Sequence, residues 1–68
     1  MSNNTITLIK IGDFYEAFDN DAATVARELD LTITRRNGRP TTGIPYHSLD
    51  RHLATLRLRG MTVQVIEK

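Results

Sequence analysis

The sequence predicts an α+β domain in which one mixed sheet of about five strands carries two packed helices. Two pairs of short segments with strand character each flank a two-residue turn, which is the pattern of a β-hairpin. Each hairpin is followed by a segment whose apolar residues recur at helical spacing, and an alternating segment comes last. The expected order is therefore hairpin, helix, hairpin, helix and strand, within a single domain at 1–68.

The first hairpin is predicted around a Gly-Asp turn. Residues 6–11 are rich in β-branched side chains and are long enough for one strand. Gly12 and Asp13 form the loop, because glycine takes a positive φ readily and aspartate tolerates it. Residues 14–18 form the return strand. The expected cross-strand pairs are Ile11–Phe14, Lys10–Tyr15, Ile9–Glu16 and Leu8–Ala17.

The first helix is predicted to follow Asn20 and Asp21, which supply N-cap chemistry and an acid for the first turn. Its apolar residues form one narrow stripe of small side chains, which favours close packing on a sheet. The stripe consists of Ala22, Val25, Ala26 and Leu29. Asp30 is expected to end this helix.

The second hairpin is predicted around Asn37-Gly38, because a type I′ turn needs a positive φ at both positions. Its incoming strand is expected at 31–34, where apolar and polar residues alternate as in a half-buried strand. The return strand is expected at 39–44. Pro40 cannot donate a ladder hydrogen bond, so we expect an edge or an irregular pairing beside it.

The second helix and the final strand complete the domain. Pro45 blocks further strand pairing, and Ser48 is placed to cap a helix that begins at the next residue. Leu58 lies off the apolar stripe of this helix and is expected at its margin or exposed, and Gly60 stands where a helix-terminating glycine belongs. The segment 61–65 alternates and predicts a strand. The buried stripe of the helix is Leu49, Leu53 and Leu56.

Length and composition limit the function classes. A chain of 68 residues without cysteine has no disulfide framework and no thiolate metal site. No run approaches the ~18 apolar residues of a membrane span, and the N-terminus lacks the basic start of a signal peptide. We therefore expect a cytoplasmic protein with no membrane partner.

No pattern for catalysis or cofactor binding is present in the sequence. His47 and His52 lie off a common helical face and have no acid at ligand spacing, which argues against a metal site. Ser48 beside His47 lacks a third orienting group, so capping explains it better than nucleophile activation. No P-loop or dinucleotide glycine motif occurs. We expect no enzyme activity, no cofactor, no metal and no small-molecule substrate.

The net charge of +1 hides an uneven distribution. Residues 13–30 hold six acids against one arginine, a net charge of −5, and residues 31–60 hold six arginines against one acid, a net charge of +5. A basic half that is entirely arginine favours bidentate phosphate contacts. Neutralisation of one half by the other across the fold explains the same pattern equally well.

The first turn places an aromatic ring beside a carboxylate. Side chains alternate along a strand, so Phe14 and Glu16 are expected on one side and Tyr15 on the other. Glu16 indicates a solvated side, and a hairpin tip lies beyond the core, so we expect Phe14 and Glu16 to point outward and Tyr15 inward. The alternative is that both rings are core residues and that Glu16 is solvated or pairs with an arginine.

Several short stretches are recognisable together and in this order. They are Gly12-Asp13-Phe14-Tyr15-Glu16 with Phe18, Asp21-Ala22, Leu29-Asp30, Thr34-Arg35-Arg36 and Gly43-Ile44-Pro45-Tyr46-His47. From about residue 6 to 67 the chain resembles the N-terminal mismatch-recognition domain, domain I, of the MutS family of DNA mismatch-repair proteins. The resemblance implies that Phe14 stacks as a wedge on a mispaired base from the minor groove and that Glu16 hydrogen-bonds the same base. The second motif is interpreted as structural, with Pro45 and Tyr46 fixing the start of the second helix.

The resemblance implies a DNA-binding module without the ATPase part. Its partner is expected to be double-stranded DNA with mispaired or flexible sites, bound weakly by the module alone, with Arg35, Arg36 and Arg39 on phosphates. MutS proteins continue into connector, lever, clamp and ATPase domains, so ATP binding is expected only in full-length relatives. The resemblance leads us to expect a longer second hairpin loop than residues 36–39 and a helical segment before the first strand. The alternative function is a protein-interaction or decoy module that keeps the fold, acts on repair proteins and does not itself bind DNA.

Overall fold

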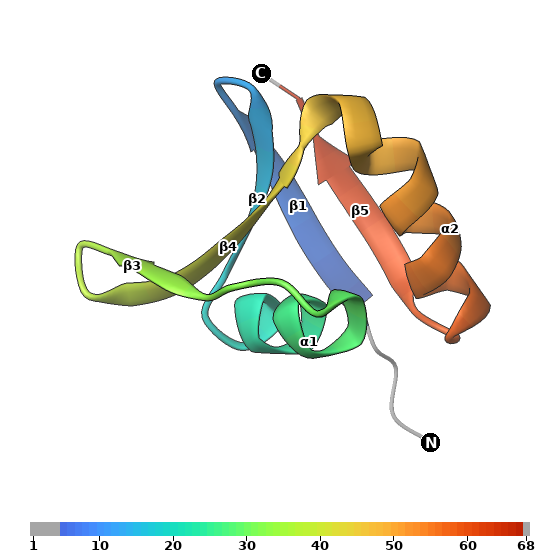
Figure 1. Cartoon of the computed structure of the whole chain (residues 1–68), viewed down its shortest axis with the longest axis horizontal. Helices are drawn as coiled ribbons and strands as arrows, with labels where there is room; N and C mark the ends of the chain where they lie inside the picture. Colours follow the sequence, from blue (N-terminus) through green and yellow to red (C-terminus); the bar gives the residue numbers. More distant parts are fainter. Residues whose placement is uncertain (1–4, 68) are drawn as a thin grey trace.

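The computed structural model describes residues 5–67. Strands and helices follow one another in the predicted order, with a short 3-10 helix, η1, before the second α-helix (Figure 1). The elements are β1 (Thr5–Ile11), β2 (Phe14–Phe18), α1 (Asn20–Leu29), β3 (Thr34–Arg36), β4 (Arg39–Pro45), η1 (Tyr46–Ser48), α2 (Leu49–Leu58) and β5 (Thr62–Ile66). The predicted α+β class is confirmed.

The strands form one mixed sheet in the order β3-β4-β2-β1-β5. Adjacent strands are antiparallel except for β1 and β5, which run parallel. Both helices contribute to the same core, because Val25 of α1 and Leu56 of α2 are fully buried in one cluster with Leu8 of β1 and Ile44 of β4. The helices therefore cover one face of the sheet, with α2 alongside β5 and α1 across one end of the sheet (Figure 1).

The first hairpin closes as predicted, with a φ of 61° at Gly12. The pairs Ile11–Phe14, Lys10–Tyr15 and Ile9–Glu16 are confirmed. The expected fourth pair, Leu8–Ala17, is wrong, because the ladder between β1 and β2 stops at Ile9. The amide of Thr7 donates instead to Asp21 Oδ2 in the first turn of α1, at 3.1 Å. A side chain of the helix thus replaces the strand partner.

The start of α1 differs from the prediction, and its end agrees with it. The N-cap residue is Asp19 rather than Asn20 or Asp21, and no side chain caps the helix. The carboxylate of Asp21 is already engaged by Thr7, which removes it from capping. Asp30 ends the helix in the left-handed conformation at φ 57°, and its amide donates to the Ala26 carbonyl.

The turn of the second hairpin is confirmed, and its incoming strand is wrong. Asn37 and Gly38 both have positive φ, 54° and 79°, as a type I′ turn requires. Only Thr34–Arg36 forms a strand, and residues 31–33 have no regular structure. Left-handed Asp30 redirects the chain there, and the amide of Leu31 donates to the Ala26 carbonyl at 2.9 Å. The alternating residues 31–33 therefore follow the end of α1, where the Leu31 amide binds a helix carbonyl, and they do not form a strand.

The end of α2 follows the predicted chemistry. Gly60, at φ 85°, donates to the Arg57 carbonyl at 3.0 Å, and Met61 donates to the Leu56 carbonyl at 3.1 Å. These two bonds form a Schellman motif, which satisfies carbonyls that the helix leaves without partners. Leu58 is 88% exposed, as its position off the stripe predicts.

The final strand, β5, begins one residue later than predicted and pairs with β1 from Thr5–Thr62 to Ile9–Ile66. No helix within residues 5–67 is long and apolar enough to cross a membrane.

Candidate nucleic-acid interface

The face of the sheet opposite the helices carries the residues that the sequence singles out. Tyr15 and Ile44 point to the helix side, so their strand neighbours point to the other face. Phe14 of β2 pairs there with Pro45 of β4 and is 44% exposed, whereas Tyr15 is only 6% exposed. The prediction that Phe14 points outward and Tyr15 inward is confirmed.

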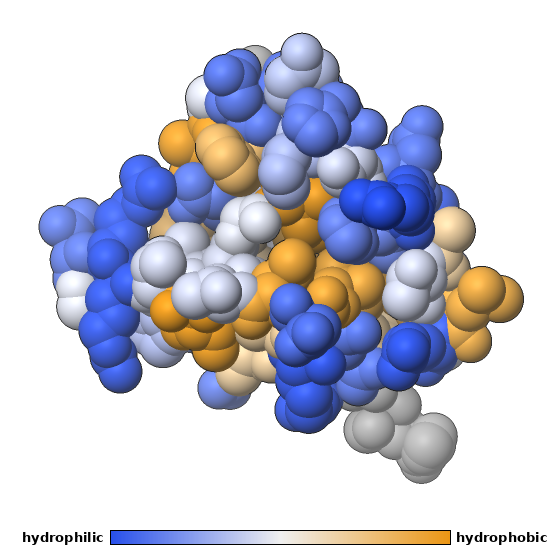
Figure 2. All heavy atoms as spheres, viewed as in Figure 1, coloured by the Kyte–Doolittle hydropathy of each residue, from blue (hydrophilic) through white to orange (hydrophobic). Residues whose placement is uncertain are grey.

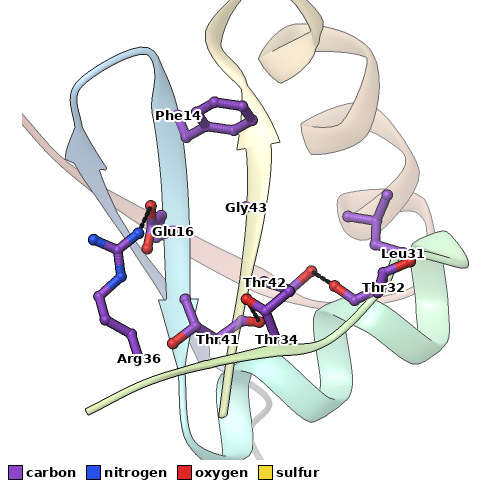
Figure 3. Close-up of a pocket in the computed structure, with 9 residues that line it drawn as sticks. All are labelled: Phe14, Glu16, Leu31, Thr32, Thr34, Arg36, Thr41, Thr42 and Gly43. Carbon is purple, nitrogen blue, oxygen red and sulfur yellow. Dashed lines mark hydrogen bonds and ion pairs between the residues drawn. The ribbon is translucent and has the colours of Figure 1, made fainter. Parts of the chain in front are cut away.

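Glu16 shares the face of Phe14 but is buried, which corrects the prediction that it points outward. Its side chain is 8% exposed, and Oε2 accepts a hydrogen bond from Arg36 Nη2 at 3.0 Å (Figure 3). Arg36 lies on β3, with β4 between it and β2. Alternation along one hairpin determines the side to which Glu16 points, but the second hairpin determines its burial.

Gly43 is a site residue that sequence reasoning missed. It pairs with Glu16 across β2 and β4. A Cβ atom at this position would lie 3.2 Å from Phe14 Cδ2 and 3.6 Å from Glu16 Cγ, so the ring and the carboxylate lie close over the bare glycine. A glycine inside a strand often marks such a close approach, and this signal was present in the sequence.

A hollow of about 360 Å³ connects these residues (Figure 3). Phe14 and the Glu16–Arg36 ion pair line it, with Gly43 at its base. The lining is completed by Leu31 and by four threonines, one in the segment before β3, one in β3 and two in β4. The hollow thus combines one exposed aromatic ring, one buried carboxylate and several hydroxyl groups.

The three arginines predicted to bind phosphate all have partners within the chain. Besides Arg36, Arg39 donates twice to Asp19, at 2.6 and 3.2 Å, and its guanidinium lies 4.9 Å from the centre of the Phe18 ring. Arg35 donates to the Gly38 carbonyl at 2.9 Å. The side chains of Arg36 and Arg39 remain more than half exposed, at 55% and 56%.

Asp19 anchors the second hairpin to the start of α1. The hydrogen bonds from Arg39 hold the pKa of its carboxyl group below the ordinary value of 3.8. The amide of Asp19 also donates to the Pro40 carbonyl at 2.9 Å. Its φ of 58° is one that residues other than glycine seldom adopt, so these contacts stabilise a strained backbone.

Comparison with known proteins identifies the family. A family model described as MutS domain I matches residues 1–68. The chain belongs to the MutS domain I family. Relatives named DNA mismatch repair protein MutS include those of Fervidobacterium nodosum, 45% identical over 65 residues, and Salinibacter ruber, 46% identical over 68 residues. These matches cover 96% and 93% of this chain and 8% of each relative, so the chain spans a small part of the relatives' length.

The two motifs of this MutS domain I chain contact each other directly. The amide of Tyr46 donates to the Asp13 carbonyl in the first hairpin turn at 2.9 Å, next to the Phe14–Pro45 pair. Tyr46 also begins η1, which leads into α2, in agreement with the structural role expected for this motif. The second motif therefore braces the turn that presents Phe14.

The opposite charges of the two halves meet in three ion pairs. Arg36 with Glu16, Arg39 with Asp19 and Arg59 with Glu28 each join an arginine of residues 31–60 to an acid of residues 13–30. Neutralisation across the fold therefore explains part of the charge pattern. The end of the molecule that carries β3 has a hydrophilic surface (Figure 2).

The two histidines, His47 and His52, do not line the hollow. No group of three His, Cys, Asp or Glu residues within residues 5–67 could hold a metal ion. Ser48 is the N-cap residue of α2, but its hydroxyl lies 3.2 Å from His47 Nδ1 and caps no backbone amide, so the expected capping bond is wrong. Burial, followed by the nearby charge of Arg51, lowers the pKa of His52 below 6.5.

Proposed function

We propose that this MutS domain I binds double-stranded DNA and senses mispaired or flexible sites with Phe14 as an apolar wedge. The observation that carries the proposal is the half-exposed ring of Phe14 beside the buried carboxylate of Glu16, both over Gly43. Membership of a family whose relatives are named DNA mismatch repair protein MutS supports it. We assign no catalytic step and no cofactor to this chain, and we expect a cytoplasmic location.

The energetics of a wedge favour defective base pairs. Insertion of an apolar ring unstacks a base step at a cost of about a few kcal/mol, and this cost is least where pairing is already disrupted. Stacking of a base on an aromatic ring returns about 1–3 kcal/mol. The balance is favourable only at a flexible site, so Phe14 selects by deformability rather than by base identity.

Glu16 supplies the polar half of the contact. A carboxylate accepts hydrogen bonds only, so it requires an N–H donor on the displaced base. Oε1 is the atom that we assign to this role, because it accepts no hydrogen bond from the described residues, whereas Oε2 already accepts one from Arg36. The Arg36 guanidinium, 3.0 Å from Oε2, offsets the charge of this carboxylate near the phosphates of the duplex.

The second hairpin supplies phosphate contacts in this proposal. Arg35, Arg36 and Arg39 lie around its turn and are exposed. Each phosphate contact that is lost should flatten the plot of log affinity against log salt by about 0.9. Arg35→Ala should therefore weaken binding to matched and mismatched duplex equally, which titrations at several salt concentrations measure. A change in mismatch preference in this variant would contradict a pure phosphate role.

The decisive experiment titrates the chain against labelled matched and single-mismatch duplexes at low salt. We expect weak binding, because the chain spans only 8% of relatives such as the MutS of Salinibacter ruber. The mismatched duplex should bind more tightly, and Phe14→Ala should abolish that difference. Equal affinity for both duplexes, or binding to neither, would overturn the proposal.

A second candidate is a protein-interaction module that acts on the repair machinery. The observation in its favour is that Arg36, Arg39 and Arg59 all pair with acids of the same chain, which reduces the charge available to phosphate. This candidate predicts no duplex binding even at low salt, together with direct binding to a full-length MutS protein. The same titration, followed by a pull-down with purified MutS, separates the two functions.

A further inference from the structure

The pairing of Arg36 with Glu16 is asymmetric. Glu16 is more than nine-tenths buried, whereas the Arg36 side chain is 55% exposed. Of the five guanidinium N–H donors, one on Nη2 binds Glu16 Oε2, and the described residues accept no hydrogen bond from the others. Arg36 therefore contacts the carboxylate with its inner side and presents donors outward.

The carboxylate is asymmetric as well. Oε2 is held by Arg36, but Oε1 is buried and accepts no hydrogen bond from the described residues. A buried acceptor without a donor is unfavourable, so Oε1 can accept a hydrogen bond from a donor outside the described residues. Both Glu16 and Arg36 line the hollow that Phe14 closes at its other end (Figure 3).

We propose that Arg36 is a positioning residue that bridges Glu16 to the DNA backbone. One guanidinium nitrogen holds Oε2 and so directs Oε1 toward the displaced base, while the outer nitrogens donate to a phosphate oxygen. The bridge screens the charge of Glu16 from the duplex, because the guanidinium lies beside the carboxylate. This inference rests on the proposed function and adds to it the group that orients the acceptor.

The neighbouring arginine provides a matched control. Arg35 belongs to the same strand and is exposed, its Nη1 donates to the Gly38 carbonyl, and it makes no ion pair with an acid of residues 5–67. Arg35→Ala thus removes one charge without disturbing Glu16. If only the positive charge matters, Arg35→Ala and Arg36→Ala should have the same effect on the mismatch preference. If Arg36 bridges Glu16 to the DNA backbone, only Arg36→Ala should lower it.

The experiment measures the affinity of the 68-residue chain for matched and single-mismatch duplexes at several low salt concentrations. The variants are Arg36→Ala, Glu16→Gln, the double variant and Arg35→Ala, each checked by thermal unfolding. Arg36→Ala should lower the mismatch preference, which Arg35→Ala leaves unchanged. Glu16→Gln should restore affinity for matched duplex in the Arg36→Ala background, with a coupling between about twofold and a hundredfold.

Three results would overturn this inference. Arg36→Ala could behave as Arg35→Ala does, or the two substitutions in the double variant could be additive. If the chain without any substitution does not prefer the mismatched duplex, the proposed function is wrong, and this inference fails with it. If Arg36→Ala does not fold, Arg36→Lys and Arg35→Lys replace the two alanine variants. Arg36→Lys alone should then lower the preference, because an ammonium group does not offer the rigid fork of a guanidinium.

Discussion

The hairpin β1–β2 lies inside the sheet, between β4 and β5, whereas the hairpin β3–β4 ends in β3 at the edge. The first tip presents an apolar ring, and the second presents Arg35, Arg36 and Arg39 around an exposed turn. Both turns have two residues with the glycine chemistry that such turns require. The type of turn therefore does not distinguish the two tips. They differ in the position of each hairpin within the sheet and in the side chains that each turn presents.

The two tips are also held by different forces. Backbone and packing contacts fix the first, since Tyr46 donates to the Asp13 carbonyl and Tyr15 is buried against the core. Ion pairs with Asp19 and Glu16 fix the second. A rigid apolar tip suits insertion into a base step, and a charged edge suits phosphate contacts. The comparison predicts that substitutions and pH affect the two hairpins differently.

The largest expected difference concerns the core beneath the first hairpin. Leu8→Ala removes a fully buried side chain and should lower the free energy of unfolding by about 2–5 kcal/mol. Ile33→Ala, just before β3, removes a side chain that is 44% exposed and should change it by less than about 0.5 kcal/mol. Urea unfolding of both variants measures this. Similar losses would show that the segment before β3 is packed as firmly as the core beneath the first hairpin.

Gly43→Ala tests the place where the two hairpins meet. The added methyl group would lie 3.2 Å from Phe14 Cδ2, so the ring or the backbone must shift. We expect a loss of stability of about 1–3 kcal/mol and a lower mismatch preference, because overpacking moves the wedge. Ala54→Gly, at an exposed position of α2, serves as a control for stability alone. Unchanged binding by Gly43→Ala would show that the position of Phe14 is not critical.

Phe14 and Tyr15 should separate binding from stability within the first hairpin. Phe14→Ala should remove about 1–3 kcal/mol of stacking on a displaced base and most of the mismatch preference. Its melting temperature should change little, since the ring is 44% exposed, whereas Tyr15→Ala should lower the melting temperature clearly. Glu16→Ala should raise affinity for matched duplex while it lowers discrimination. If Phe14→Ala unfolds as readily as Tyr15→Ala, the wedge proposal fails.

The smallest expected effects are those of pH, and they have opposite signs in the two hairpins. The Tyr15 hydroxyl donates to Glu67 Oε2 at 2.8 Å, and this bond, with burial, raises the pKa of Tyr15 above 10.0. Its contribution to stability is present below pH 10 and is lost as the pH rises through the raised pKa. The pKa of Asp19 lies below 3.8, so its contribution is present above pH 3.8 and is lost as the pH falls.

Melting temperatures across the pH range test this pair of effects. Tyr15→Phe should reduce the alkaline loss and leave the acid side unchanged, while Asp19→Asn should do the reverse. Tyr46→Phe is the matched control, because Tyr46 is 56% exposed. If both variants change the melting temperature equally at acid and at alkaline pH, the assignment of one pH-dependent hydrogen bond to each hairpin is wrong.

Local chemistry was sufficient to predict much of this domain from the sequence. Residues that tolerate positive φ located both hairpin turns, and Gly60 located the end of α2. Helical spacing identified Val25 and Leu56 as core residues, which are fully buried. Alternation alone assigned Phe14 and Tyr15 to opposite faces. Each of these features depends on residues that are neighbours along the chain, so the sequence by itself determined them.

Tertiary structure decided those features in which a backbone or side-chain group binds a residue that is distant in the sequence. Asp21 takes the amide of Thr7 and ends the first ladder early. The loss of the predicted strand at 31–33 is local instead, because left-handed Asp30 directly precedes it. Arg36, 20 positions from Glu16, covers a carboxylate that alternation alone placed in solvent. The physical reason is that burial and hydrogen bonding are settled by what lies across the sheet, and a local pattern contains no information about that neighbour.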